Sequence, residues 1–364
     1  MTLPTIRTLL LSSVASMFLL LILDVWIKKE EMFESFAAQF VNAERTEQIA
    51  ADRQAVRQTA ERRVEVPANG IETVSLAVER GNIAVRRSDG ASIMLQATVT
   101  AAGADAETAG RRLDQVQVAE RVENGVLTFR STHEDMASGR EAVTIDYALS
   151  VPDGVAVRVE LDRGNVDVSG VRSDVETKTG RGVADIVGVT GDVTATVSEG
   201  ELYVAGIEGS VTLSNRNGTA TVEDVTGDVA LDAYASSTYV SRIDGAVEGT
   251  VAQGAAQVRD VSGPLALTGR VANLRLGGLR GDADISAEYG KLRLYMTEPE
   301  GYALQATVDG GVIRTRLPIA IKSDSERPHL SRMNGVVGDG TWKITIDAAA
   351  TDVILHANDE GERQ

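Results

Sequence analysis

Two aspartates are the best-placed candidates for chemistry in this sequence. Asp167 and Asp185 lie 18 residues apart, each between two apolar residues, so parallel pairing of their segments would bring the carboxylates about 4.8 Å apart. Polysaccharide-cleaving sites need either two acids roughly 5 to 10 Å apart or acids that hold Ca²⁺. The equivalent positions of later segments hold no basic residue until Arg275, and few aromatic residues could build a sugar cleft. We therefore expect two acids on a solvated surface and not a catalytic pair.

The other residues with catalytic or metal-binding chemistry form no pattern. His133, His329 and His356 are isolated in the sequence, whereas catalytic and metal sites need partners at fixed spacings. The lack of cysteine excludes a disulfide framework, thiolate catalysis and acyl attachment through cysteine. The glycines separate strand patterns and do not lead into a helix, so they form no phosphate-binding loop. We predict a protein that is not an enzyme and that has no cofactor or metal.

Two tyrosines and a threonine are the candidates for ligand contact. They belong to one outward-facing series with an 18-residue spacing, which runs Asp167, Asp185, Tyr203, Thr221, Tyr239, Gln257, Arg275 and Arg293. The simplest interpretation of this series is a solvated β surface with no binding role. The functional interpretation is a long, flat contact surface on which Tyr203 and Tyr239 stack against sugars or peptides, with Thr221 between them.

A repeat from Gly164 to Leu294 must position these side chains. An apolar residue followed two places later by a turn residue returns every 18 residues, from Val171 to Leu279. A second column holds Gly164, Gly182, Gly200, Gly218, Gly254 and Gly290, with Ser236 and Ala272 in the remaining places. Short strand patterns between the turns alternate apolar and polar residues, which directs alternate side chains inward. This fixed period predicts an all-β fold, a parallel β-solenoid (β-helix) with 18-residue coils.

An anchor and a stalk are predicted before the repeats. The apolar run from Leu9 to Ile27 can cross a ~30 Å hydrocarbon core as a helix, and no small-residue cleavage site follows it. Its anchoring side chains include Leu9, Leu19, Leu20, Leu21, Ile22 and Trp26. Glu30 to Arg63 contain no Gly or Pro, which favours a helix. The phenylalanine stripe at its start could pack on lipid headgroups or on a partner helix.

Caps are predicted at both ends of the repeats, because an open end would expose strand edges. The N-terminal cap combines strands with one short helix at Ala104–Val116, and the C-terminal cap combines strands with a polar loop at Lys322–Gly335. The expected organisation is an anchor at 1–29, a helical stalk at 30–63, a β cap at 64–160, solenoid repeats at 161–298, a second β cap at 299–357 and a disordered tail at 358–364.

Composition narrows the function classes. The chain has 364 residues and a formal net charge of −17, which argues against nucleic acid, because phosphate binding needs a basic footprint. Apolar residues make up 43% and aromatic residues 4% of the chain, so the expected core is aliphatic. A repeat array makes chain length a poor guide to the number of domains.

Several phrases of the sequence resemble the bacterial putative-adhesin family. They are Tyr147 to Gly154, Gly164-Asn165-Val166-Asp167-Val168, Arg80-Gly81-Asn82-Ile83-Ala84-Val85, and Gly335-Val336-Val337-Gly338 with Ile344 to Leu355. The resemblance covers about Val64 to His356. It implies a β-solenoid domain with Gly-Asn/Asp-Val-x-Val units, exposure at the cell envelope and a binding role, and it supplies no catalytic residues.

The predicted function is a membrane-anchored, non-enzymatic adhesin-like surface. We expect a single-pass protein of the cell membrane with the solenoid outside the cytoplasm, either periplasmic or at the cell surface. Its expected partners are the membrane and an envelope protein or polysaccharide, with oligomers formed through the stalk helix. Two alternatives remain: a membrane-associated scaffold or polymerising β-helix, and, less favoured, a polysaccharide-active β-helix enzyme.

Overall fold

The computed structural model describes residues 56–131, 143–296 and 301–356. Contacts divide the chain into two compact units, residues 1–57 with 102–110 and residues 58–101 with 111–364. The second unit holds the surfaces discussed below. The helix α3 (Ala106–Gln115), whose first half belongs to the first unit, begins after Asp105, whose carboxylate accepts a hydrogen bond of 2.7 Å from the Thr108 N–H. The described residues thus form the all-β fold with one short helix that the sequence predicts.

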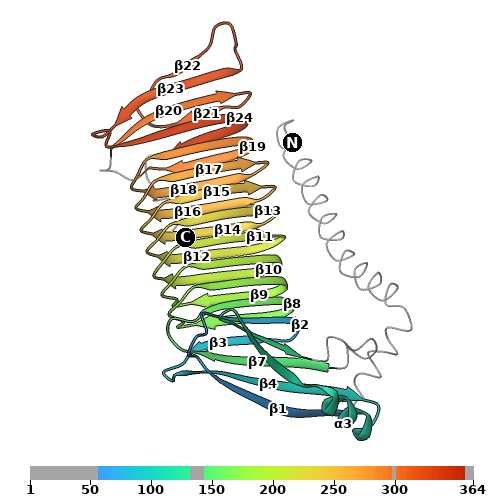
Figure 1. Ribbon diagram of the computed structural model, residues 1–364. Helices are drawn as coiled ribbons and strands as arrows, with labels where there is room; N and C mark the ends of the chain where they lie inside the picture. The colour runs from blue at the N-terminus through green and yellow to red at the C-terminus, as the bar shows by residue number, and fades with distance from the viewer. Residues whose placement is uncertain (1–55, 132–142, 297–300, 357–364) are drawn as a thin grey trace, which may run out of the picture. The chain divides into compact units, whose positions relative to one another are not determined.

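A parallel stack makes up most of the second unit (Figure 1). Each strand pairs with the strand 18 residues later, as Val193 does with Val211 and Val211 with Val229. The stack contains β8 (Ala156–Ser169), β9 (Val175–Val187), β10 (Val193–Ile207), β11 (Val211–Arg216), β12 (Gly218–Val225), β13 (Val229–Tyr234), β14 (Ser237–Ile243), β15 (Val247–Ala252), β16 (Ala255–Val261), β17 (Leu265–Arg270), β18 (Asn273–Leu279) and β19 (Ala283–Tyr295).

Every 18-residue repeat contributes to two outer faces. The threonine face consists of the outward residues of β11, β13, β15 and β17 and of the first halves of β8, β9, β10 and β19. The tyrosine face consists of the outward residues of β12, β14, β16 and β18 and of the second halves of the same long strands. The inward residues, such as Val204, Val222 and Val258, are completely buried. Alternation along each strand therefore separates an aliphatic core from two polar faces.

A ladder of side chains connects successive repeats at the turn before each threonine-face strand. Asp174 accepts a hydrogen bond from the Asp192 N–H, and Asp192 accepts one from the Ser210 N–H, at 2.9 and 2.8 Å. The ladder ends at Ala246, which has no side-chain acceptor, and the next residue in this column is Pro264, which has no N–H to satisfy. The turn sequence therefore satisfies its own backbone donors from one repeat to the next.

The two caps are insertions within the array. β2 (Thr73–Arg80) and β3 (Ile83–Arg87) both pair in parallel with β8, although 68 residues separate Arg87 from Ala156. At the other end, β24 (Trp342–His356) pairs in parallel with β19 over its length, so parallel pairing continues beyond residue 298. The inserted strands are β4 (Ser92–Gly103), β5 (Val118–Glu123), β6 (Val126–Ser131), β7 (Val143–Val151), β20 (Tyr302–Asp309), β21 (Ile313–Thr315), β22 (Ile321–Ser323) and β23 (Leu330–Val337).

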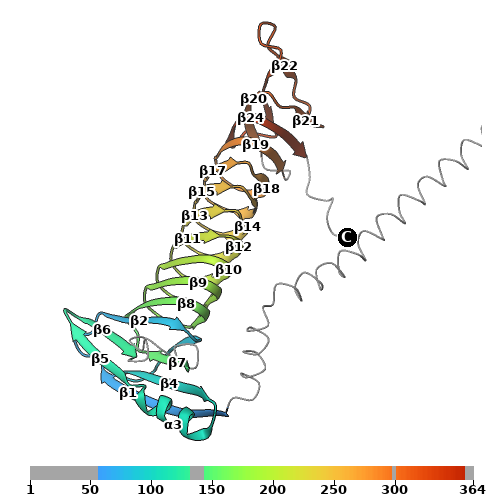
Figure 2. The same ribbon diagram turned by 90° about the vertical axis from the view of Figure 1, so that its right-hand side faces the viewer.

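Antiparallel strands end the stack on both sides. β4 pairs antiparallel with β7, and β23 pairs antiparallel with β20. In Figure 2 the stack lies between these two groups of strands. The predicted polar loop at Lys322–Gly335 was wrong in its second half, because Leu330–Val337 is a strand held by its pairing with β20.

The prediction of a helix was also wrong for the last residues of the stalk. Residues from Val56 to Arg63 belong to a strand, β1 (Val56–Pro67), which pairs with β4. Helix propensity is a weak preference, and pairing at a sheet edge overrides it here. The rest of the stalk, the anchor at Leu9–Ile27 and the tail at 358–364 lie outside the described residues. Among the residues that are described, no helix has the length and apolar character needed to cross a bilayer.

Candidate binding surfaces

The tyrosine face brings the three predicted contact residues together. Tyr203 on β10 pairs with Thr221 on β12, which pairs with Tyr239 on β14. Neighbouring strands lie about 4.8 Å apart, so two strand spacings, about 10 Å, separate the tyrosine backbones, with Thr221 between them. The result is one straight column of two aromatic rings and a hydroxyl.

The two tyrosines of this column differ in the hydrogen bonds that their hydroxyl groups form. The Tyr203 hydroxyl donates a hydrogen bond to Glu223, and Arg242 donates one to the same carboxylate at 2.5 Å. These bonds lower the pKa of Glu223 from its ordinary value, and the bond to Glu223 raises the pKa of the Tyr203 hydroxyl. Tyr239 is 46% exposed, and its hydroxyl bonds no other residue within the described ranges. Of the two rings, that of Tyr239 is therefore more available to a ligand.

The acidic end of the tyrosine face has a partner that sequence reasoning missed. Asp167 and Asp185 lie opposite each other on β8 and β9, as expected. Arg86 of β3 donates two hydrogen bonds to the Asp167 carboxylate, at 2.8 and 2.6 Å. Because β3 precedes β8 by a long insertion, no local spacing indicated this contact. The column of Asp167 and Asp185 holds no basic residue before Arg275, but Arg86 reaches Asp167 from outside that column and forms a bidentate surface ion pair with it.

Asp185 is the less favourably placed of the two acids. Its Oδ1 is buried and accepts no hydrogen bond from any described residue. Burial, followed by the charge of Asp167, raises the pKa of Asp185, and Arg86 opposes this effect. Both causes disfavour the ionised carboxylate.

The basic end of the same face contains an aromatic stack that the sequence did not indicate. The rings of Tyr295 and His356 are stacked, with centroids 4.6 Å apart and planes 8° from parallel. The Arg275 guanidinium lies 5.0 Å from the Tyr295 ring centroid. His356 was expected to be isolated, and parallel pairing of β24 with β19 places it opposite Tyr295. Of the other histidines, His329 has its Nε2 atom 3.4 Å from Oδ1 of Asp309, and His133 lies outside the described residues.

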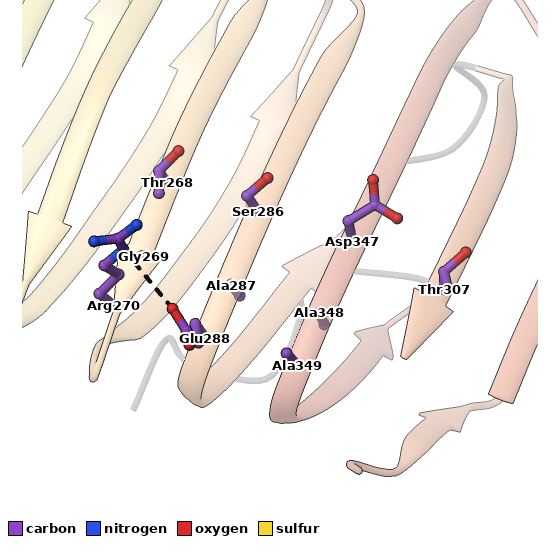
Figure 3. Close-up of a pocket in the computed structure, with 10 residues that line it drawn as sticks. All are labelled: Thr268, Gly269, Arg270, Ser286, Ala287, Glu288, Thr307, Asp347, Ala348 and Ala349. Atoms are coloured by element: carbon purple, nitrogen blue, oxygen red, sulfur yellow. Dashed lines mark ion pairs between the residues drawn. The ribbon is translucent and has the colours of Figure 1, made fainter. Parts of the chain in front are cut away.

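A hollow of about 430 Å³ lies on the threonine face, within the volume range of small-ligand sites. Figure 3 shows a row of polar side chains along it, and these are Thr268 on β17, Ser286 on β19, Asp347 on β24 and Thr307 on β20. The small residues Gly269, Ala287 and Ala348 also line it and leave the space open between the longer side chains. An ion pair of 3.8 Å joins Arg270 and Glu288 beside it. The row offers hydroxyl and carboxylate groups to a polar ligand.

Comparisons with known proteins give structural similarities only. No protein-family model matches this sequence, and no curated protein matches it. A putative adhesin from Bacteroides fragilis aligns at 13% identity and a TM-score of 0.38, covering 82% of this chain and 97% of that one. A putative cell adhesion protein from Clostridium sporogenes aligns at 10% identity and a TM-score of 0.20, covering 82% and 99%.

A third solved structure carries a different description. A putative lipid binding protein from Parabacteroides distasonis aligns at 10% identity and a TM-score of 0.28, covering 82% of this chain and 97% of that one. These identities and TM-scores are too low to transfer a function to this chain.

Proposed function

We propose that this protein is a non-enzymatic, adhesin-like binding protein, in which the 18-residue repeats form a parallel β-solenoid displayed outside the cytoplasm. The observation that carries the proposal is the column of Tyr203, Thr221 and Tyr239, which lie on β10, β12 and β14, three neighbouring strands of the sheet. A flat face with evenly spaced aromatic and hydroxyl groups suits an extended ligand that contacts several repeats at once, such as a polysaccharide or a peptide.

Two observations favour binding over the alternatives. Antiparallel strands pair with the outermost parallel strands at both ends, which hinders end-to-end polymerisation through exposed strand edges. The paired acids Asp167 and Asp185 also differ from a hydrolytic pair, because Arg86 donates hydrogen bonds to both carboxylate oxygens of Asp167, at 2.8 and 2.6 Å, and occupies them.

Replacing Tyr239 with alanine is expected to weaken ligand binding about tenfold, because an exposed aromatic ring at the centre of a contact typically contributes more than about 1.4 kcal/mol. The measurement is the affinity of wild type and Y239A for a panel of immobilised neutral glycans, acidic glycans and extended peptides. The change removes an exposed ring, so the melting temperature should stay close to that of wild type.

Tyr234→Ala is the matched control for Tyr239→Ala. Tyr234 is also a strand tyrosine and is 43% exposed, but it lies at the end of β13, in the threonine-face series. Y234A should bind every ligand of the panel as wild type does. Equal losses in the two variants would remove the tyrosine face as the binding site.

Display outside the cytoplasm rests on the apolar segment Leu9–Ile27 of the sequence. We expect protease added to intact cells or to spheroplasts to remove a carboxy-terminal epitope. Digestion of intact cells would indicate surface display, and digestion of spheroplasts alone would indicate a periplasmic protein. Protection in both, with digestion after lysis, would contradict display and favour the scaffold alternative.

A further inference from the structure

The charge of the tyrosine face changes sign along the stack. The acids Asp167 and Asp185 lie at one end, whereas Arg275 pairs with Arg293 on neighbouring strands at the other end. The outward residues of β18 and of the second halves of β19 and β24 include the cations Arg275, Lys291 and Arg293 and a single acid, Asp352. Arg314 already bonds Asp352, at 2.9 Å. The basic end is thus locally positive in a chain whose net charge is −17.

Arg293 is the cation at this end to which an anionic ligand would add most. Arg275 and Arg293 lie directly opposite each other, and like charges at such positions repel. Arg293 forms no ion pair or hydrogen bond with any residue that the structure describes, and its side chain is only half exposed. A bound anionic group would offset the repulsion and give the Arg293 guanidinium an acceptor.

An aromatic platform lies beside the cations. Tyr295 follows Arg293 by two residues in β19, on the same face of the strand, and its ring stacks on that of His356. The residue opposite Tyr295 is Gly277, where a Cβ atom would lie 3.3 Å from the Tyr295 Cβ. The Arg275 guanidinium lies 5.0 Å from the Tyr295 ring centroid. Neither the Tyr295 hydroxyl nor the His356 imidazole bonds a side chain among the described residues. The site therefore combines the Arg293 guanidinium with a preorganised aromatic stack.

The cations also continue the tyrosine column. Tyr239 pairs with Gln257, Gln257 with Arg275, and Arg275 with Arg293. A ligand that follows this column meets an aromatic ring, an amide and then two guanidinium groups. The acids Asp167 and Asp185 at the far end of the face would repel an anionic group placed beside them, so the carboxylates of a bound polymer are held at the basic end of the column.

We propose that Lys291, Arg293, Tyr295 and His356 form a carboxylate-binding site for an acidic, uronate-containing polysaccharide, with Arg275 held against the Tyr295 ring. The assignment rests on the proposed binding function of the tyrosine face and names its ligand class. The Arg293 guanidinium and the Lys291 ammonium group bind the uronate carboxylate, and the Tyr295–His356 stack contacts the sugar rings.

The test compares binding of the full chain to polygalacturonate and to its methyl-esterified form, in which the same polymer lacks the charge. Wild type should bind polygalacturonate at least tenfold more tightly than the ester, and this preference should decrease as salt is raised. R293Q should lose about tenfold in affinity for polygalacturonate and keep its affinity for the ester. R216Q is the control, because it removes an exposed cation at the end of β11 and should bind as wild type does.

Three results would overturn the assignment: equal binding of the two polymers, unchanged affinity in R293Q, or equally tight, Arg293-dependent binding of single-stranded DNA. Binding of a neutral glycan or peptide that depends on Tyr239, without binding of polygalacturonate, would reject this assignment and leave the proposed function intact. Arg293-dependent binding of polygalacturonate that Y239A does not affect would support the site and reject the tyrosine contact.

Discussion

Replacing Gly182 with alanine is expected to destabilise the stack by more than about 3 kcal/mol. A Cβ atom at this position would lie 1.7 Å from the carbonyl oxygen of Gly164, and the Gly182 φ of +144° is one that other residues rarely adopt. The colliding oxygen belongs to the backbone of the preceding repeat, which parallel pairing holds in place. The strain therefore cannot be relieved by rotating a side chain.

The measurement for G182A is thermal unfolding followed by circular dichroism. A loss of 3 kcal/mol corresponds to a decrease of roughly 4 to 5 °C in melting temperature, at an unfolding entropy of about 2.1 cal/mol/K per residue. Gly90→Ala is the control, because the nearest atom to its Cβ would be the Ser88 hydroxyl at 3.4 Å, and it should unfold close to wild type. An unchanged melting temperature in G182A would mean that the repeats tolerate side chains in the glycine column.

Replacing Asn215 with valine is expected to stabilise the protein by about 1 to 3 kcal/mol, because burying an amide without a hydrogen bond costs about this much. Asn215 is fully buried, and neither its Oδ1 nor its Nδ2 has a partner among the described residues. It points inward from β11, where its neighbours on the adjacent strands are Val197 and Ala233. Valine would continue this aliphatic column.

Urea unfolding curves of N215V and wild type measure this gain. Asn273→Val is the matched control, because Asn273 begins β18 with its side chain exposed, so the change should alter stability by less than about 0.5 kcal/mol. A lower midpoint for N215V would contradict the prediction and would mean that water satisfies the buried amide in solution.

The repeat period was sufficient to predict which residues become neighbours within the array. In a parallel stack with a constant period, each residue pairs with the one 18 places later, so the column of Tyr203, Thr221 and Tyr239 follows from counting. Alternation at period two likewise predicted which side chains are buried. The same rule placed Asp167 opposite Asp185.

The insertions at both ends of the array interrupt the 18-residue period, so contacts made there could not be predicted by counting residues. Arg86 reaches Asp167 because β3 pairs with β8, and His356 stacks on Tyr295 because β24 pairs with β19. The offset between paired residues is 83 in the first case, as for Ile83 and Val166, and 61 in the second, as for Ala283 and Ile344. No fixed period spans these segments.

The sequence by itself therefore determined the all-β class, the inward and outward faces and the tyrosine column, since these follow from local alternation and a constant spacing. The tertiary structure alone decided the partner of Asp167, the Tyr295–His356 stack beside Arg275, and the hollow between Thr268 and Thr307. The physical reason is that a strand arriving after an insertion pairs wherever a free edge can satisfy its backbone hydrogen bonds, and sequence spacing does not specify that edge.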